Sequence, residues 1–241
     1  MYVIGDVHGC HNTLEKLLDK LPDWHVHGIC FVGDLIDRGP KSAHVVRKVR
    51  ELEDEYQNVW CVRGNHEQMM VDEVDNEGPV IRFSGLWTSN GGVETISSYK
   101  DLYGQTWKHS LVYDKLWMES LPVYHRTDHE FEGKEIVVSH SHITKAFNKR
   151  HDPEIKGYFE RSTMWGRNVP KDMLCDDIYN VIGHTIVEEP KVTEDFTNLD
   201  TGAFLGSEKW KQYCIDNSLC GKLTALKIPE MTLISQETVE E

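Results

Sequence analysis

The sequence has few basic residues and lacks long apolar runs, and both absences exclude classes of partner. Its 241 residues contain 26 Lys and Arg against 40 Asp and Glu, which gives a formal net charge of −14. This balance argues against nucleic-acid and membrane-surface partners, because such binding needs a basic footprint. No run of about 18 consecutive apolar residues occurs, so we expect no membrane span.

The cysteines and the N-terminal residues indicate the compartment. The six cysteines form no C-x-x-C pair, and Cys30 and Cys61 fall within apparent strands, as is typical of reduced core residues. Met1 leads directly into the strand-like residues 2–4, without the charged and apolar regions of a signal peptide. We therefore expect a cytoplasmic protein.

Short apolar runs alternate with helical spacings along the first third of the chain. Runs at 2–4, 29–32 and 59–62 predict strands, and each is followed by a polar loop and an amphipathic segment. Such units predict an α/β fold with a parallel sheet, whose loops meet at the carboxyl ends of the strands. Further strands are predicted at 123–126, 135–139, 179–182, near 192, at 196–199 and at 223–228.

Four segments have weaker patterns. Residues 78–121, with scattered Trp, Gly and Ser, predict a partly helical cap or insertion. Residues 142–177 are rich in loop signals, and 205–219 have the character of an insertion. Residues 229–241 form an acidic C-terminal tail. No repeat or linker divides the chain, so we expect a single domain over 1–241.

Polar residues at the ends of the predicted strands form a candidate metal site. The candidate ligands are Asp6, His8, Asp34, Asn65, His140 and His184. Carboxylate, imidazole and amide donors suit manganese, iron or zinc. Six ligands exceed the four of a structural zinc site, but they are enough for two divalent ions that share one carboxylate. Two ions about 3.5–4 Å apart are a standard device for phosphate-ester hydrolysis, in which a bridging hydroxide attacks phosphorus in line.

That reaction also needs cations for the phosphate oxygens and an acid for the leaving group. Arg38 and Arg63 flank the predicted ligands, and Arg167 comes from a later loop. Arginine suits paired contacts to phosphate. His66 follows a ligand without needing to bind metal, and Asp37 is placed to orient it and keep it protonated.

Five motifs carry a family resemblance. The set G-D-V-H-G, G-D-L-I-D-R-G, R-G-N-H-E, S-H and G-H-T resembles the metallophosphatase superfamily. Within it, residues 64–70, the W-x-R of 165–167 and the D-T-G-A of 200–203 resemble the phosphoprotein phosphatases, most closely the bacteriophage lambda type. The resemblance implies a two-sheet β-sandwich flanked by helices, manganese as the usual activating ion, and serine/threonine phosphoprotein substrates that release inorganic phosphate.

The resemblance also implies a role for each candidate residue. Asp6, His8 and Asp34 would hold the first metal, and the second would be held by Asp34, Asn65, His140 and His184. His66 and Asp37 would form the pair that supplies the acid. Arg38 and Arg167 would bind the phosphate, with Arg63 as a third phosphate ligand.

Two other functions compete with a protein phosphatase. A hydrolase of diadenosine tetraphosphate or another nucleotide is suggested by R-G-P-K-S at 38–42. Two positions argue against it. That group usually lacks an acid at the position of Asp37, and its third motif usually ends with Asp, where this chain has Glu67. A non-catalytic phosphate-binding module would be expected to have a substituted ligand, and none of the six is missing.

Overall fold

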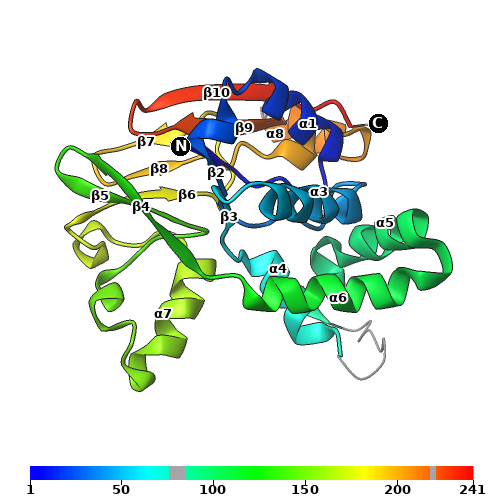
Figure 1. Ribbon diagram of the computed structural model, residues 1–241, viewed down its shortest axis with the longest axis horizontal. Coiled ribbons are helices and arrows are strands. Elements are labelled where there is room, and N and C mark those ends of the chain that lie inside the picture. The colour runs from blue at the N-terminus through cyan, green and yellow to red at the C-terminus, as the bar shows by residue number, and fades with distance from the viewer. Residues whose placement is uncertain (76–84, 218–220, 241) are drawn as a thin grey trace.

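The computed structural model describes residues 1–75, 85–217 and 221–240, which form two β-sheets with helices around them (Figure 1). Cys220 lies outside these ranges, as do residues 78–84 of the predicted cap, 218–219 of the predicted insertion and Glu241 of the tail. Within the described ranges, no helix is both long and apolar enough to cross a bilayer.

The first sheet contains the three strands that the start of the chain predicts. Its order is β10-β9-β1-β2-β3, and β1, β2 and β3 are parallel, while β9 and β10 are antiparallel additions at one edge. These strands are β1 (Tyr2–Ile4), β2 (Ile29–Phe31), β3 (Val59–Cys61), β9 (Lys222–Lys227) and β10 (Thr232–Glu237).

The second sheet has the order β4-β5-β6-β8-β7. Strands β5, β6 and β8 are parallel, so their carboxyl ends lie at one edge. The strands are β4 (Tyr124–Phe131), β5 (Lys134–Ser139), β6 (Ile178–Ile182), β7 (Lys191–Val192) and β8 (Phe196–Asn198). The sequence predicts all five within a few residues, except that β4 continues to Phe131.

Alternation of side chains along the strands creates the core. In β1, Val3 contributes to a buried cluster with Ile136 and Val138 of β5, whereas its neighbours Tyr2 and Ile4 belong to the cluster under the helices. Successive strand residues point to opposite faces, so one strand serves both layers. The two sheets therefore pack face to face, and the predicted helix-flanked two-sheet fold is confirmed.

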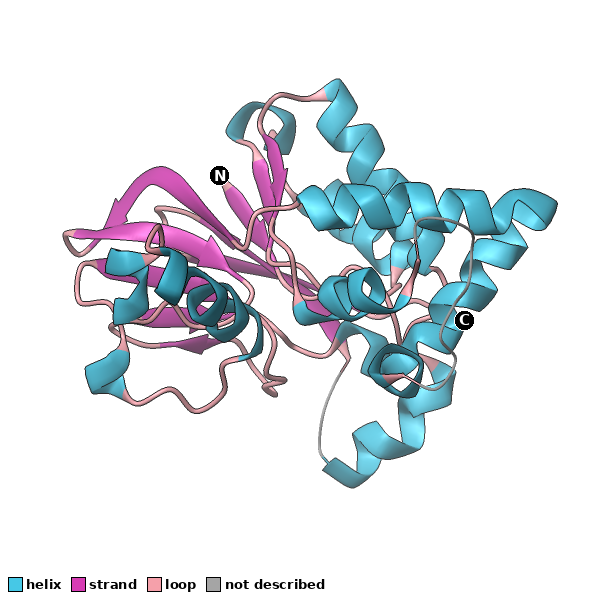
Figure 2. Ribbon diagram, turned by 90° about the horizontal axis from the view of Figure 1, so that it is seen from below, coloured by secondary structure: helices cyan, strands magenta, loops and turns pink. Residues whose placement is uncertain are grey.

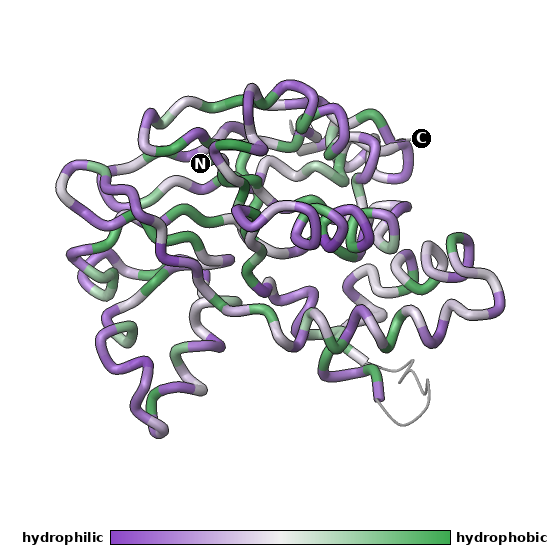
Figure 3. Tube along the Cα trace, viewed as in Figure 1, coloured by the Kyte–Doolittle hydropathy of each residue, from purple (hydrophilic) through white to green (hydrophobic). Residues whose placement is uncertain are grey.

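The helices cover the outer faces of the sheets. The bounds are α1 (His11–Lys20), α2 (Trp24–His27), α3 (Ser42–Glu55), α4 (Asn65–Glu73), α5 (Val93–Tyr103), α6 (Trp107–Ser120), α7 (Pro153–Trp165) and α8 (Lys211–Asn217). Figure 2 shows most helices on one side of the molecule and the strands on the other. Figure 3 shows α3 with alternating hydrophilic and hydrophobic residues, in keeping with its buried Val45, Val46 and Val49.

Two elements differ from the sequence interpretation. Helix α7 lies in the segment predicted to be rich in loops; its start is marked by Asp152, whose side chain accepts the Glu154 N–H, and by Pro153 at the first position. Strand β10 lies in the predicted acidic tail. Its pairing with β9 is a tertiary effect that its weak local pattern does not reveal.

Candidate active site

The six predicted metal ligands converge at the carboxyl ends of the strands. Each follows a strand or begins the next helix, as expected where the loops of parallel strands meet. All six side chains belong to residues that are at most 7% exposed, namely Asp6, His8, Asp34, Asn65, His140 and His184. Burying so many polar groups together is costly unless they pair with one another or with a ligand.

Backbone carbonyls orient the histidines. The Nδ1 atom of His8 lies 2.8 Å from the Ile36 carbonyl oxygen, and Nδ1 of His140 lies 3.0 Å from that of Val32. Each Nδ1 therefore carries a hydrogen and donates it, which turns Nε2 towards the shared space. This is the arrangement that metal-binding histidines usually adopt.

Asp34 is the centre of the cluster. Its Oδ2 lies 3.5 Å from Nε2 of His8, 3.3 Å from Nε2 of His140 and 3.9 Å from Nε2 of His66. Two groups could each hold a metal ion, and both contain Asp34: one with His8 and His66, the other with His140 and His184. Burial alone would raise the pKa of Asp34, but the surrounding histidines hold it well below its usual value.

His140 shows that this space favours a cation. Its Nε2 lies 2.8 Å from the Asn65 Oδ1 and 3.3 Å from the Asp34 carboxylate, so it faces two acceptors. Burial lowers the pKa of His140, but Asp34 outweighs it and raises the pKa to about 9. A proton satisfies this need, and a divalent ion held by the same nitrogen and oxygen atoms would do so equally well.

Arginines contact the other two candidate histidines, His8 and His184. Nη1 of Arg38 lies 2.8 Å from Nε2 of His8, and Nε of Arg167 donates to Nε2 of His184 at 3.0 Å. A guanidinium can only donate, so both imidazoles are neutral and offer a lone pair to the site. Burial, with His140 and Arg167 nearby, lowers the pKa of His184 to about 3. Neutral imidazole is the form that binds a metal.

The predicted acid pair is formed, with two partners that sequence reasoning missed. Nδ1 of His66 lies 2.6 Å from Oδ2 of Asp37. The other carboxylate oxygen accepts hydrogen bonds from the Trp87 indole at 2.9 Å and the Thr95 hydroxyl at 2.6 Å. Burial raises the pKa of Asp37, which His66 and these donors oppose. Trp87 and Thr95 come from the predicted cap, where no motif marked them.

Arg38 also reaches His66, and this changes one expectation. Its Nη2 lies 3.0 Å from Nε2 of His66. Since the guanidinium donates, Nε2 accepts and the hydrogen resides on Nδ1, towards Asp37. The imidazole is therefore neutral in this arrangement, whereas the sequence interpretation had it protonated. Arg38 itself lies over the ring of Phe204, with Cζ 4.8 Å from the centroid.

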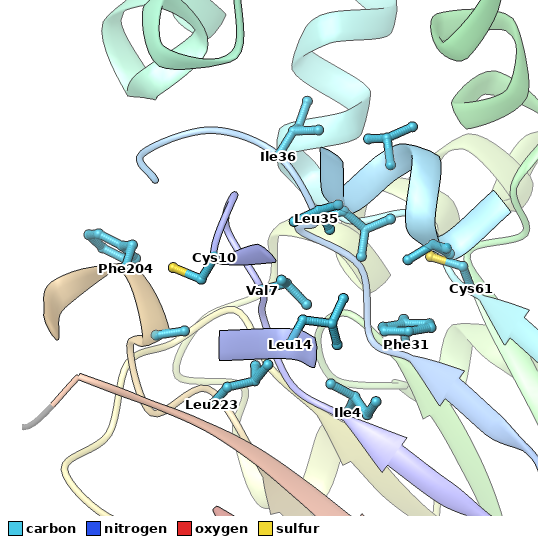
Figure 4. Close-up of a cluster of buried hydrophobic side chains, with 14 of the residues drawn as sticks. Ile4, Val7, Cys10, Leu14, Phe31, Leu35, Ile36, Cys61, Phe204 and Leu223 are labelled. Atoms are coloured by element: carbon cyan, nitrogen blue, oxygen red, sulfur yellow. The ribbon is translucent and has the colours of Figure 1, made fainter. Parts of the chain in front are cut away.

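Glu67 supports the loop after β2. Its carboxylate accepts the backbone N–H groups of Asp34 and Leu35, both at 2.8 Å, and of Gly64 at 2.9 Å. Burial, together with the nearby Asp34, raises the pKa of Glu67 to about 7. Figure 4 shows Leu35 and Ile36 on the same loop, within the buried hydrophobic cluster. The loop is thus held by apolar packing and by one carboxylate.

The backbone of the site lies in the left-handed region. Positive φ values occur at His8 (43°), Asp34 (51°), Asp37 (73°), Arg38 (67°) and His184 (70°). Such values are uncommon for residues other than glycine and cost free energy unless the surroundings enforce them. Their concentration here is typical of a functional site.

Arg63 and Asp200 differ from their sequence interpretation. Arg63 is not brought to the cluster: its Nη1 donates to the Glu119 carbonyl at 3.0 Å, at the end of α6. Asp200, which sequence reasoning noted only as part of a motif, is buried, and burial raises its pKa to about 6. Its charge also acts on Asp6, whose pKa burial raises well above its usual value.

Comparison with known proteins agrees with this geometry. The calcineurin-like phosphoesterase family matches residues 1–204. The asymmetrical bis(5'-nucleosyl)-tetraphosphatase PrpE of Bacillus cereus is 28% identical, over 97% of this chain and 92% of that protein. The protein of the same name from Halalkalibacterium halodurans is 27% identical, with the same coverage of both chains.

Two solved structures share the fold. One, provisionally assigned as a diadenosine tetraphosphatase, gives a TM-score of 0.60 at 19% identity, covering 98% of this chain and 92% of that one. The other, a protein serine/threonine phosphatase from Saccharomyces cerevisiae, gives 0.56 at 17% identity, covering 100% and 80%. These relatives are named as dinucleoside tetraphosphatases or, for the yeast structure, as a serine/threonine phosphatase, so the expected likeness to the lambda type is not shown. The chain belongs to the calcineurin-like phosphoesterases, and its buried histidines and aspartates are groups that could hold metal ions.

Proposed function

We propose that this enzyme hydrolyses dinucleoside tetraphosphates asymmetrically, to a nucleoside triphosphate and a nucleoside monophosphate. One observation carries the proposal: the relatives named as asymmetrical bis(5'-nucleosyl)-tetraphosphatases align over 97% of this chain and 92% of their own. This reverses the order of the two enzymatic functions that the sequence suggests. The extended similarity to these relatives, together with the motif at 38–42, supports the nucleotide hydrolase despite the differences at Asp37 and Glu67.

The donor set fits two divalent ions. By the family resemblance, Asp6, His8 and Asp34 would hold one ion, although the structure groups His66 rather than Asp6 with His8 and Asp34. The other ion would be held by Asp34, Asn65, His140 and His184. When bound, the two ions supply charge for the phosphoryl oxygens and lower the pKa of water, so that a nucleophile forms near neutral pH. Manganese is our first expectation, with iron or zinc as alternatives.

The remaining residues position the phosphate and handle the proton. Arg38 contacts His8 and Arg167 contacts His184, and both arginines line the same pocket, so their guanidinium groups would stabilise charge on the phosphoryl oxygens. When Arg38 turns towards phosphate, Nε2 of His66 loses its donor and can carry a proton. Asp37, held by Trp87 and Thr95, would then stabilise the imidazolium as it gives that proton to the leaving group.

Serine/threonine phosphatase activity is the second candidate, and the acid pair favours it. A serine alkoxide is a far more basic leaving group than a nucleotide phosphate, so it depends more on proton donation. The 2.6 Å contact of His66 with Asp37 is suited to that task. The fold likeness to the yeast phosphatase does not discriminate, because both enzyme types share this fold.

The test compares initial rates of the manganese-loaded enzyme on diadenosine tetraphosphate and on a phosphoserine peptide. We expect a clear preference in kcat/KM for the dinucleotide, and ATP with AMP as the products separated by ion-exchange chromatography. Preference for the peptide would support the second candidate. Release of product that chelation leaves unchanged, or no release at all, would contradict both metal-dependent activities.

A further inference from the structure

A pocket of about 380 Å³ adjoins the candidate active site, and its two ends differ in chemistry. One end is formed by Arg38, Arg167 and His184, all of which belong to the cluster described above. The other end is formed by Phe204, Trp210 and Tyr213. Trp210 and Tyr213 belong to the segment 205–219 that the sequence marks as an insertion, and Phe204 directly precedes it. The volume lies within the range of small-molecule sites, roughly 300–1,000 Å³.

In this group of three aromatic rings, each ring lies nearly perpendicular to the next. The centroids of Phe204 and Trp210 lie 5.2 Å apart with their planes at 83°, and those of Trp210 and Tyr213 lie 6.3 Å apart at 86°. Phe204 is buried, Trp210 partly buried, and Tyr213 half exposed. A flat ligand in such a corner contacts the face of one ring and the edge of the next, which is the favoured geometry for aromatic groups.

One contact with α5 and one contact within the segment itself hold this wall in place. Lys209 forms an ion pair with Glu94 of α5, and its Nζ lies 5.3 Å from the centre of the Trp210 ring. The Cys214 thiol hydrogen bonds to the Leu205 carbonyl at 2.9 Å. The rings are therefore carried by a segment that is tied to the rest of the domain.

Phe204 joins the wall to the phosphate end. Its ring lies beneath the Arg38 guanidinium and also 5.2 Å from the ring of His8, edge to face. A ligand that spans the pocket would place an anionic group at Arg38 and Arg167 and a flat ring at Trp210 and Tyr213. A nucleotide has both groups, linked by a ribose.

We propose that the aromatic end of this pocket binds a nucleobase of the substrate, with Trp210 and Tyr213 as the residues that select for it. The proposal rests on the proposed function and names the part of the substrate that this wall recognises. Every base offers a face for stacking, so the wall would favour nucleotides over simple phosphates without strong preference among bases. A phosphoserine side chain would leave these rings uncontacted.

The experiment uses two phosphoanhydride substrates: diadenosine tetraphosphate, which carries nucleobases, and inorganic tripolyphosphate, which carries none. The variants are Trp210→Ala, Trp210→Phe and Tyr213→Ala, with Tyr158→Ala as a control, because Tyr158 is a similarly exposed tyrosine on α7. We expect Trp210→Ala and Tyr213→Ala to lower kcat/KM for the dinucleotide on the order of ten-fold, the effect of one lost stacking contact. The value for tripolyphosphate should change less than about two-fold, and Trp210→Phe should retain most activity on both.

Equal losses on both substrates would overturn the proposal, since the wall would then act through the metal site or through stability. Trp210→Phe and Tyr213→Ala keep the test valid if Trp210→Ala does not fold. A larger loss on a phosphotyrosine peptide than on the dinucleotide would also overturn it, in favour of a peptide side chain.

A binding measurement separates this proposal from the proposed function. Calorimetric titration of the manganese-loaded protein with AMP and with inorganic phosphate requires no turnover. If the wild type fails to cleave diadenosine tetraphosphate, the proposed function is wrong; yet weaker AMP binding in both alanine variants, with phosphate binding unchanged, would still support a nucleobase pocket. Unchanged AMP affinity in both variants would overturn the nucleobase pocket even if the wild type cleaves the dinucleotide.

Discussion

Two regions border the same space at the carboxyl ends of the strands, and they are built differently. The strand-end loops supply buried carboxylates and imidazoles, with a left-handed backbone at His8, Asp34 and His184. The aromatic wall, Phe204 to Tyr213, supplies rings from two short helical turns and from α8, and its rings become more exposed from Phe204 to Tyr213. The loops are fixed by two sheets, whereas the wall is fixed by a few side-chain contacts. The comparison suggests that the loops perform the chemistry and the wall selects the substrate.

Asp34→Asn should have the largest effect and should not discriminate between substrates. Asp34 belongs to both groups that could hold a metal, so losing its charge weakens both. We expect kcat/KM to fall on the order of 1,000-fold or more on dinucleotide and tripolyphosphate alike. Metal content measured by mass spectrometry should fall with it, while Asp101→Asn, on the exposed face of α5, should change neither. Retention of two metal ions per chain would contradict this role.

His66→Asn should separate proton donation from metal binding. We expect turnover to fall roughly 100- to 10,000-fold on a phosphoserine ester and less on the dinucleotide, whose leaving group is less basic. Metal content should be unchanged, and His151→Asn, at an exposed histidine, serves as the control. If the loss is the same on both substrates, His66 does not act as the acid.

Glu67→Gln should affect stability more than selectivity. The amide cannot accept all three backbone N–H groups that the carboxylate accepts, so at least one buried donor loses part of its bonding. A cost of about 1–3 kcal/mol corresponds to a decrease in Tm of roughly 2–12 °C for a chain of this size. Thermal unfolding followed by circular dichroism measures it. An unchanged Tm would show that the Glu67 carboxylate does not contribute to the stability of this loop.

Arg63→Ala should have the smallest effect, and it is best read against Arg38→Ala. Arg38 touches two histidines of the cluster, whereas Arg63 donates to a carbonyl of α6. We expect Arg38→Ala to lower kcat/KM on the order of 100-fold and Arg63→Ala less than about three-fold. Losses of equal size would show that Arg63 binds the phosphate, as the sequence predicts.

The strand-end loops were largely predictable from the sequence, for a physical reason. Asp6, Asp34 and His184 each follow a short apolar run and a glycine, and strand order alone brings such positions to one edge. Nine of the ten strands found in the described residues, and the two-sheet fold, are close to the prediction. The tenth strand, β10, depends on its partner β9, so its local pattern carries little information.

The supports of the site were not predictable in the same way. Trp87 and Thr95 bond to Asp37 across 50 and 58 residues of sequence, and no local spacing predicts such a contact. The hydrogen position on His66 depends on where Arg38 rests, which only the folded structure determines. Phe204 lies one residue past a recognisable motif, but its place under Arg38 follows from the packing of the turn at 203–206.

The far end of the chain returns to its beginning. Helix α1, which starts just after His8, has no side-chain cap of its own at Cys10. Instead Oε1 of Glu240 accepts the Thr13 N–H at 2.9 Å, and the Thr13 hydroxyl accepts the N–H of Val239 at 3.0 Å. During synthesis the first turn of this helix gains these two hydrogen bonds only after residues 239 and 240 have emerged, so the helix that follows the His8 loop is completed by a contact between segments far apart in the sequence.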